Sequence, residues 1–210
     1  MAIIALSASY GAGGSVIAPM VAERSDVPLL SRAVPAADSQ RMNEEARESA
    51  YSEEELERGL WQRLLNALAS APSPVELGGV PDGGEHPDLV LRAEAEEQLS
   101  AFAAGGRGVV LGWAATLAVP GAYCVRLDGP PESRLLRGME IEDIDEATAR
   151  ERLERTDEVR RLYWRRLYHR DWNDPSQYHL WLDTTVLRLD VCAGLIIDAA
   201  EGFEAGQEVD

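Results

Sequence analysis

The chain has 210 residues, a net charge of −17, and hydrophobic and charged shares of 45% and 27%. These values predict one soluble globular domain with a single buried core. The negative charge argues against a protein that follows a nucleic-acid backbone, because that function needs a basic surface. A small phosphorylated ligand in one locally basic cleft remains compatible with it.

All 20 basic side chains are arginine, and the sequence contains no lysine. GC-rich coding explains this bias, but its chemical consequence is that Schiff-base catalysis is excluded. The two cysteines, Cys124 and Cys192, lie far apart in apolar stretches, so we expect them to be buried small hydrophobes in a reducing compartment. No apolar run is long enough to cross a membrane and the N-terminus lacks a basic signal region, so we expect a cytoplasmic protein.

The first half of the chain begins with a buried strand at 2–6, which leads through a Gly-rich turn into a helix at 14–24. A short strand follows at 27–31. The region 38–71 has a helical pattern in two segments, and Ser52 and Glu55 fit a capping box at the start of the second. Residues 72–87 are rich in proline and glycine and are expected to form a flexible loop.

In the second half, helices again alternate with strands. The expected helices are at 88–104, 131–139, 145–170 and 189–200. The expected strands are at 108–112, 122–128 and 179–185. We interpret residues 1–203 as one domain with an acceptor-side helical region at 35–105 and a lid-like helical segment at 139–172, followed by an acidic tail at 204–210.

This alternation predicts an α/β domain with a mainly parallel sheet and helices on both faces. In such sheets, ligands bind beyond the carboxyl ends of the strands. The loops after Leu6, Leu30, Gly112 and Asp128 are therefore expected to border one crevice.

The turn after the first strand reads SASYGAGGS, residues 7–15. Aligned with the phosphate-loop pattern G-x-x-x-x-G-K-[ST] from residue 8, it matches at Gly13 and Ser15, with Ala8 and Gly14 in the places of the first glycine and the lysine. Backbone N–H groups and a helix N-terminus bind anions without that lysine. Its loss costs roughly 10²–10³ in rate, by analogy with other charge-stabilising donors, so catalysis needs cations from elsewhere.

Two interpretations of this turn stay open. The glycines fit a phosphate loop or a tight strand–helix turn that binds nothing. Ser15 fits a Mg²⁺ ligand or a simple helix cap.

The stretch RTDEVRRLYWRRLYHRDW, residues 155–172, contains six arginines in this acidic chain. On a helical wheel, Val159, Leu162, Tyr163 and Leu167 form an apolar arc and Arg160 lies beside it. Arginines near a packing face need anionic partners. The partners are either carboxylates of the same chain or a bound phosphate, which suits guanidinium geometry, with Asp157 orienting one of the arginines.

Four stretches together resemble the cytidylate kinase-like family of bacterial proteins, which is related to the nucleoside-monophosphate kinases of the phosphate-loop class. They are SASYGAGGSVIA, VVLGWAA, RLDGPPESRLLRGME and TDEVRRLYWRRLYHRDWNDPSQYHLWLDTT. The resemblance runs from about residue 3 to residue 200 and is thinnest between 35 and 105. It implies a three-layer P-loop NTPase-type domain with a five-stranded parallel sheet and a helical lid. It also implies transfer of the γ-phosphoryl group of ATP, with Mg²⁺, to a nucleoside monophosphate or another small acceptor.

The resemblance also implies roles for particular residues. The loop residues Gly11, Ala12, Gly13, Gly14 and Ser15 would hold the donor phosphates, and Ser15 would also be the metal ligand. Arg137 would contact the nucleotide. The catalytic set would be Arg134 at the start of the lid, with Asp157, Arg160 and Arg161 in the lid itself.

The chain departs from the family pattern at three places. Ser15 stands where the family usually has an arginine, Gly112-Trp113-Ala114 replaces a Gly-Arg-Gly after the third strand, and Ser31 lies where an acidic residue is common. Trp113 either stacks on a base or fills the core. The rival hypothesis is therefore a catalytically degenerate protein that binds a nucleotide or a partner. Neither hypothesis involves nucleic acid or a membrane, and the oligomeric state is open.

Overall fold

The computed structural model describes residues 2–31, 87–112 and 115–207. The expected helices at 38–71, the capping box and Trp113 lie outside the described residues. The chain divides into two compact units, Met1–Ala33 with Gln98–Asp210, and Val34–Glu97. In the second unit the described residues, 87–97, are helical. The sheet and the cleft described below belong to the first unit.

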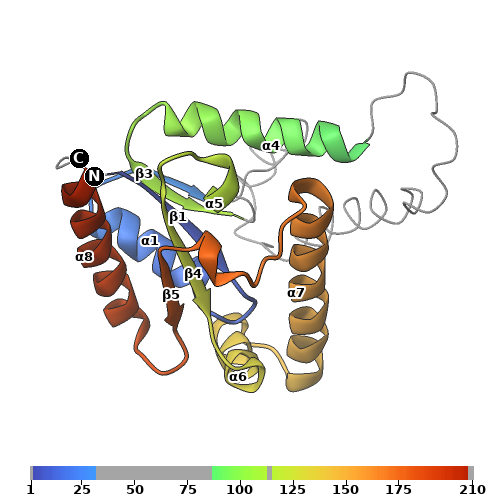
Figure 1. Ribbon diagram of the computed structural model, residues 1–210. Helices are drawn as coiled ribbons and strands as arrows, with labels where there is room; N and C mark the ends of the chain where they lie inside the picture. Colours follow the sequence, from blue (N-terminus) through green and yellow to red (C-terminus); the bar gives the residue numbers. More distant parts are fainter. Residues whose placement is uncertain (1, 32–86, 113–114, 208–210) are drawn as a thin grey trace, which may run out of the picture. The chain divides into compact units, whose positions relative to one another are not determined.

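Five strands form one parallel sheet in the order β2-β3-β1-β4-β5, which confirms the predicted α/β fold (Figure 1). The strands are β1 (Ile3–Ala8), β2 (Leu29–Ser31), β3 (Gly108–Leu111), β4 (Tyr123–Asp128) and β5 (Leu180–Asp183). The helices are α1 (Gly14–Arg24), α4 (Pro87–Ala103), α5 (Ala115–Ala118), α6 (Pro131–Glu142), α7 (Glu146–Tyr168) and α8 (Leu189–Gln207), with a 3₁₀ turn η1 (Pro175–Gln177).

Strand β1 extends two residues beyond its expected end at residue 6, through Ser7 and Ala8. These two residues pair with Arg126 and Leu127 of β4. At the other end of the chain, α8 extends seven residues beyond the expected end at residue 200. Phe203 anchors this extension, because its ring packs 5.1 Å from that of Tyr123 and 4.7 Å from that of His179, measured between centroids.

Each face of the sheet is covered by helices, as expected for buried parallel strands. On one face, Ile4, Leu6 and Val125 pack with apolar residues of α1 and α8, and Figure 1 shows these two helices side by side. On the other face, Ala5 and Cys124 pack with residues of α5 and the end of α4. Both Cys124 and Cys192 are buried free thiols, as predicted.

On the second face of the sheet, the residues change from apolar to polar along β1 and β4. Residues at alternate positions share one face, so Ile3, Ala5 and Ser7 of β1 lie beside Cys124, Arg126 and Asp128 of β4. The amino-terminal positions are apolar and the carboxyl-terminal positions are polar. A polar floor therefore forms at the carboxyl ends of β1 and β4, where the fold places its ligands.

Candidate functional site

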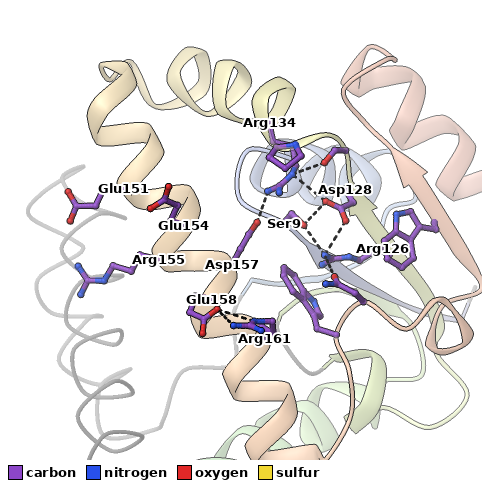
Figure 2. Close-up of a pocket in the computed structure, with 15 residues that line it drawn as sticks. Ser9, Arg126, Asp128, Arg134, Glu151, Glu154, Arg155, Asp157, Glu158 and Arg161 are labelled. Carbon is purple, nitrogen blue, oxygen red and sulfur yellow. Dashed lines mark hydrogen bonds and ion pairs between the residues drawn. The ribbon is translucent and has the colours of Figure 1, made fainter.

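An open cleft of about 930 Å³ lies over this polar floor (Figure 2). One wall is the helix α7, which contributes Glu151, Glu154, Arg155, Asp157, Glu158 and Arg161. The opposite side is built by Ser9, Asp128 and Gly129 at the strand ends, with Trp172, Asn173 and Trp181. The lining thus joins the ends of β1 and β4 to α7. Of the four loops that the sequence predicted to border one crevice, those after β1 and β4 contribute residues to this lining.

The turn between β1 and α1 is shaped by glycines. Gly11 and Gly13 adopt left-handed φ angles of 70° and 74°, which favour glycine. Gly13 caps α1, and Val16 and Ile17 donate to its carbonyl oxygen. Among the described residues, the amides of Gly14 and Ser15 have no hydrogen-bond acceptor. The helix therefore begins with donors available to an anion, as a phosphate loop requires.

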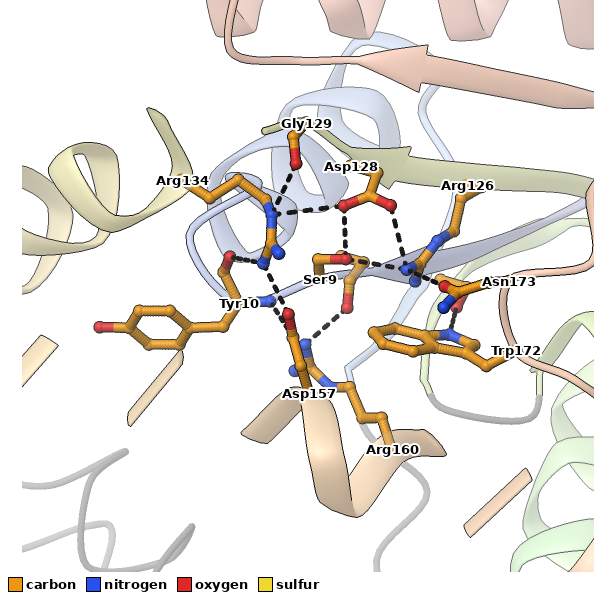
Figure 3. A network of polar contacts seen from close by, with 12 residues as sticks. Ser9, Tyr10, Arg126, Asp128, Gly129, Arg134, Asp157, Arg160, Trp172 and Asn173 are labelled. Atoms are coloured by element: carbon orange, nitrogen blue, oxygen red, sulfur yellow. Dashed lines mark hydrogen bonds and ion pairs between the residues drawn. The ribbon is translucent and has the colours of Figure 1, made fainter. Parts of the chain in front are cut away.

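Tyr10 fixes this turn to both α6 and α7 (Figure 3). Its amide donates to Asp157 Oδ1 at 2.9 Å, and its carbonyl accepts from Arg134 Nη1 at 2.8 Å. Arg134 Nη1 also pairs with Asp157 Oδ2 at 2.7 Å, which closes the triangle. The Tyr10 hydroxyl donates to Glu142 Oε2 at 2.9 Å. The loop and the two helices are thus held as one network.

Three further arginines from the predicted set bind protein acceptors. Arg160 Nη1 donates to Ala8 O at 2.6 Å, so α7 also contacts the end of β1, beside the loop. Arg161 pairs with Glu158 on its own helix, and Arg137 donates to the carbonyl of Thr184.

The structure therefore brings part of the predicted site together. Arg134, Asp157 and Arg161 line the cleft, and Arg160 contacts the end of β1. Ala12, Gly13 and Gly14 are buried, Gly11 is half-buried and Ser15 is exposed, and none of the five lines the cleft. Arg137 lies by the end of β5 instead. The nucleotide-binding roles of these residues stay predictions.

The position of the missing lysine is packed too tightly for a side chain. A Cβ atom at Gly14 would lie 2.7 Å from Cβ of Ala8 and 3.3 Å from Cδ1 of Leu111. Gly14 therefore allows α1 to pack close to β1 and β3. This packing requires a residue without a side chain at position 14, so substitution of Gly14 by lysine alone would not produce a usual phosphate loop.

A buried polar cluster around Arg126 was missed by the sequence reasoning. Arg126 Nη2 donates to Ser9 Oγ at 2.8 Å and pairs with Asp128 Oδ2 at 3.3 Å, and Ser9 Oγ donates to Asp128 Oδ1 at 2.7 Å. Burial lowers the pKa of the Arg126 guanidinium, and Asp128 opposes that shift. The available signal was the strand YCVRLD, in which two charged residues, Arg126 and Asp128, lie on the same face of an otherwise apolar strand.

The described residues contain no group of three or more His, Cys, Asp or Glu side chains arranged to hold a metal ion. Among the described helices, none is both long enough and apolar enough to cross a membrane.

Comparison with known proteins gives a consistent assignment. The model of the cytidylate kinase-like family matches residues 3–186. The chain is similar to an uncharacterized protein from Eubacterium ventriosum, with 18% identity, a TM-score of 0.62, and coverage of 96% of this chain and 99% of that one. It is also similar to TT1252 from Thermus thermophilus, with 20% identity, a TM-score of 0.50, and coverage of 95% and 97%.

A shikimate kinase from Acinetobacter baumannii, solved in complex with shikimate, aligns with 16% identity and a TM-score of 0.46 over 95% of this chain and 92% of that one. No curated protein matches the chain.

Proposed function

The chain belongs to the cytidylate kinase-like family and is a nucleotide kinase-like protein, and we propose that it is an ATP-dependent phosphotransferase. It would move the γ-phosphoryl group of Mg-ATP to a nucleoside monophosphate or another small acceptor. The observation that carries the proposal is the double contact that α7 makes with the end of β1 and with the β1–α1 loop. Asp157 and Arg160, three residues apart in the sequence, bind the amide of Tyr10 in the loop and the carbonyl of Ala8 at the end of β1.

This contact brings α7 to the place where a phosphate loop would hold the donor. Phosphoryl transfer depends mainly on positioning and on offsetting the charge of the transferring group. The amides of Gly14 and Ser15 would hold phosphate oxygens. Arg160 and Arg161 would supply the charge that a loop lysine usually supplies, with Arg134 and Asp157 setting the position of α7.

The start of α1 offers a group that would suit the Mg²⁺ ion of an ATP–Mg²⁺ complex. Ser15 is exposed at the start of α1, beside an amide that has no acceptor among the described residues, so its hydroxyl is the proposed metal ligand. When bound, Mg²⁺ would neutralise charge on the phosphate oxygens. The chain's own contribution is to orient the phosphates with backbone amides and to exclude water beneath α7.

The proposal is tested by ADP release with Mg-ATP and a panel of acceptors, including CMP, dCMP and UMP. Acceptor-dependent turnover is the expected result. As a matched control for the arginine chemistry, Arg188→Ala removes an exposed arginine that pairs with Asp190 outside the cleft. This variant should retain full turnover. ATP binding without turnover for any acceptor would refute phosphoryl transfer.

The second candidate is a catalytically degenerate protein that binds a nucleotide or a partner. The observation that favours it is the packing at Gly14, which leaves no space for the usual lysine. Arg134, Arg160 and Arg161 also have protein acceptors in this arrangement. Calorimetry with ATP separates the two functions when combined with the turnover assay, because both bind nucleotide and only the first transfers phosphate.

A further inference from the structure

Arg126 makes all of its hydrogen bonds through one nitrogen. Nη2 contacts Ser9 Oγ at 2.8 Å, Asp128 Oδ2 at 3.3 Å and Asn173 Oδ1 at 3.4 Å (Figure 3). Nε and Nη1 are buried and have no acceptor among the described residues. The side chain is 1% exposed. A charged group buried in this way ordinarily has its donors satisfied.

The aromatic neighbours of Arg126 stabilise its buried charge but leave its free N–H donors without acceptors in the described part of the chain. Its Cζ atom lies 3.5 Å from the centroid of the Trp172 ring, a cation–π stack that favours the charge. Stacking does not supply acceptors to donors in the guanidinium plane. Trp172 itself is held by its own hydrogen bond from Nε1 to Ser7 Oγ at 2.9 Å. The guanidinium is therefore fixed, with donors that remain without acceptors.

The charges of the cleft do not favour a highly charged ligand at this place. Four arginines and five carboxylates line it, so their formal charges nearly cancel. Beside Arg126, the side chain of Trp181 lies with its ring centroid 5.5 Å from Cζ, and this residue is 39% exposed. The local surface thus combines guanidinium donors with an accessible aromatic face. That combination suits a planar ring carrying carbonyl or ring-nitrogen acceptors.

We propose that Arg126 and Trp181 form a subsite for a nucleobase. A carbonyl or ring nitrogen of the base would accept from Nε or Nη1, and the ring would stack against Trp181. Asn173, which is exposed and contacts Nη2 at 3.4 Å, would move aside to admit it. The inference rests on the proposed function in taking the ring to be part of a nucleotide substrate.

The test is calorimetric titration of the full chain with cytidine, uridine, adenosine and guanosine, which carry no phosphate, and with inorganic phosphate. Wild type should bind at least one nucleoside. Arg126→Met should weaken that binding by about tenfold or more, because a hydrogen bond to a charged donor is lost. Trp181→Leu should weaken it too, and Trp181→Phe should retain it, because phenylalanine preserves an aromatic face.

Two controls keep the outcome clear. Arg188→Met removes an exposed arginine outside the cleft and should leave binding unchanged. If Arg126→Met fails to fold, the exposed Trp181 variants decide the question alone. Absence of nucleoside binding, equal binding by Trp181→Leu and Trp181→Phe, or phosphate binding that depends on Arg126 while nucleosides do not bind would each overturn the subsite.

This test separates the two proposals. Nucleoside binding that depends on Trp181, without acceptor-dependent ADP release, would refute the phosphotransferase and leave the base subsite standing. Acceptor-dependent turnover with the same KM in Trp181→Leu and Trp181→Phe would refute the subsite and leave the phosphotransferase standing.

Discussion

Substitution of Gly11 by alanine tests whether the β1–α1 loop is held against α6 as tightly as the structure indicates. At a φ of 70°, alanine costs about 1–2 kcal/mol through its left-handed backbone alone. The added Cβ would also lie 2.0 Å from the carbonyl oxygen of Arg134, a backbone atom that cannot rotate away. Such overpacking adds about 1–3 kcal/mol, so the total is about 2–5 kcal/mol.

Two other glycines provide matched controls. Gly106 and Gly121 have φ angles of 77° and 76°, and a Cβ at either would meet nothing within 4 Å. Their alanine variants should show the backbone cost alone. For a domain of this size, each kcal/mol lowers the melting temperature by about 2–4 °C. Thermal unfolding should therefore place Gly11→Ala clearly below both controls, and equal melting temperatures for all three would refute the tight contact.

Three further predictions concern the arginine helix, the phosphate loop and the buried acids. Arg160→Ala should lower turnover by about 10³-fold, the scale of transition-state arginines, while the protein stays folded; unchanged turnover in the assay would exclude Arg160 from catalysis. Gly14→Lys should lower the melting temperature without raising turnover, because its Cβ overlaps Ala8; a more active variant would contradict the packing. Burial raises the pKa of Cys124 from 9.0 to about 11 and that of Tyr178 from 10.0 to about 12. Both groups thus keep their protons in the folded state at a pH where the unfolded chain has lost them. The free energy of unfolding should therefore fall as the pH rises from 9 through 12. Urea unfolding across that pH range should show this fall in the free energy of unfolding. In Cys124→Ala the fall between pH 9 and 11 should be smaller than in the wild type.

The fold was predictable from the sequence because it rests on local, repeated signals. Apolar runs such as AIIAL and GVVLG alternate with helical patterns, and this order specifies a parallel sheet. The ends of β1 and α8 could not be predicted from such local patterns. Ser7 belongs to β1 because it pairs with the neighbouring strand, and α8 extends because Phe203 reaches Tyr123 and His179. Both depend on contacts between distant residues.

The site was predictable only in part, for the same reason. The helix carrying Asp157 and Arg160 was identified from its arginines, and in the structure these side chains contact the β1–α1 loop and the end of β1, respectively. A helical wheel could not show that Asp157 accepts from a backbone amide or that Arg160 donates to a backbone carbonyl. The Arg126 cluster joins residues from three distant segments, and the alternation of Arg126 and Asp128 within β4 does not show that Ser9 and Asn173 contact them. Arg170, at which the predicted helix 145–170 ends, lies beyond the end of α7 and is exposed.

The network at Tyr10 shows how a loop without lysine can still be suited to an anion. Asp157 accepts from the Tyr10 amide and pairs with Arg134, so a carboxylate already lies between a backbone donor and a guanidinium. These are the two kinds of donor that a phosphate oxygen seeks. A phosphate that entered here would exchange one anionic acceptor for another and would leave no donor unsatisfied. An anion that displaced Asp157 from this place would also break the contacts of α7 with the loop and with Arg134, which would couple anion binding to the position of α7 without a charged side chain at Gly14.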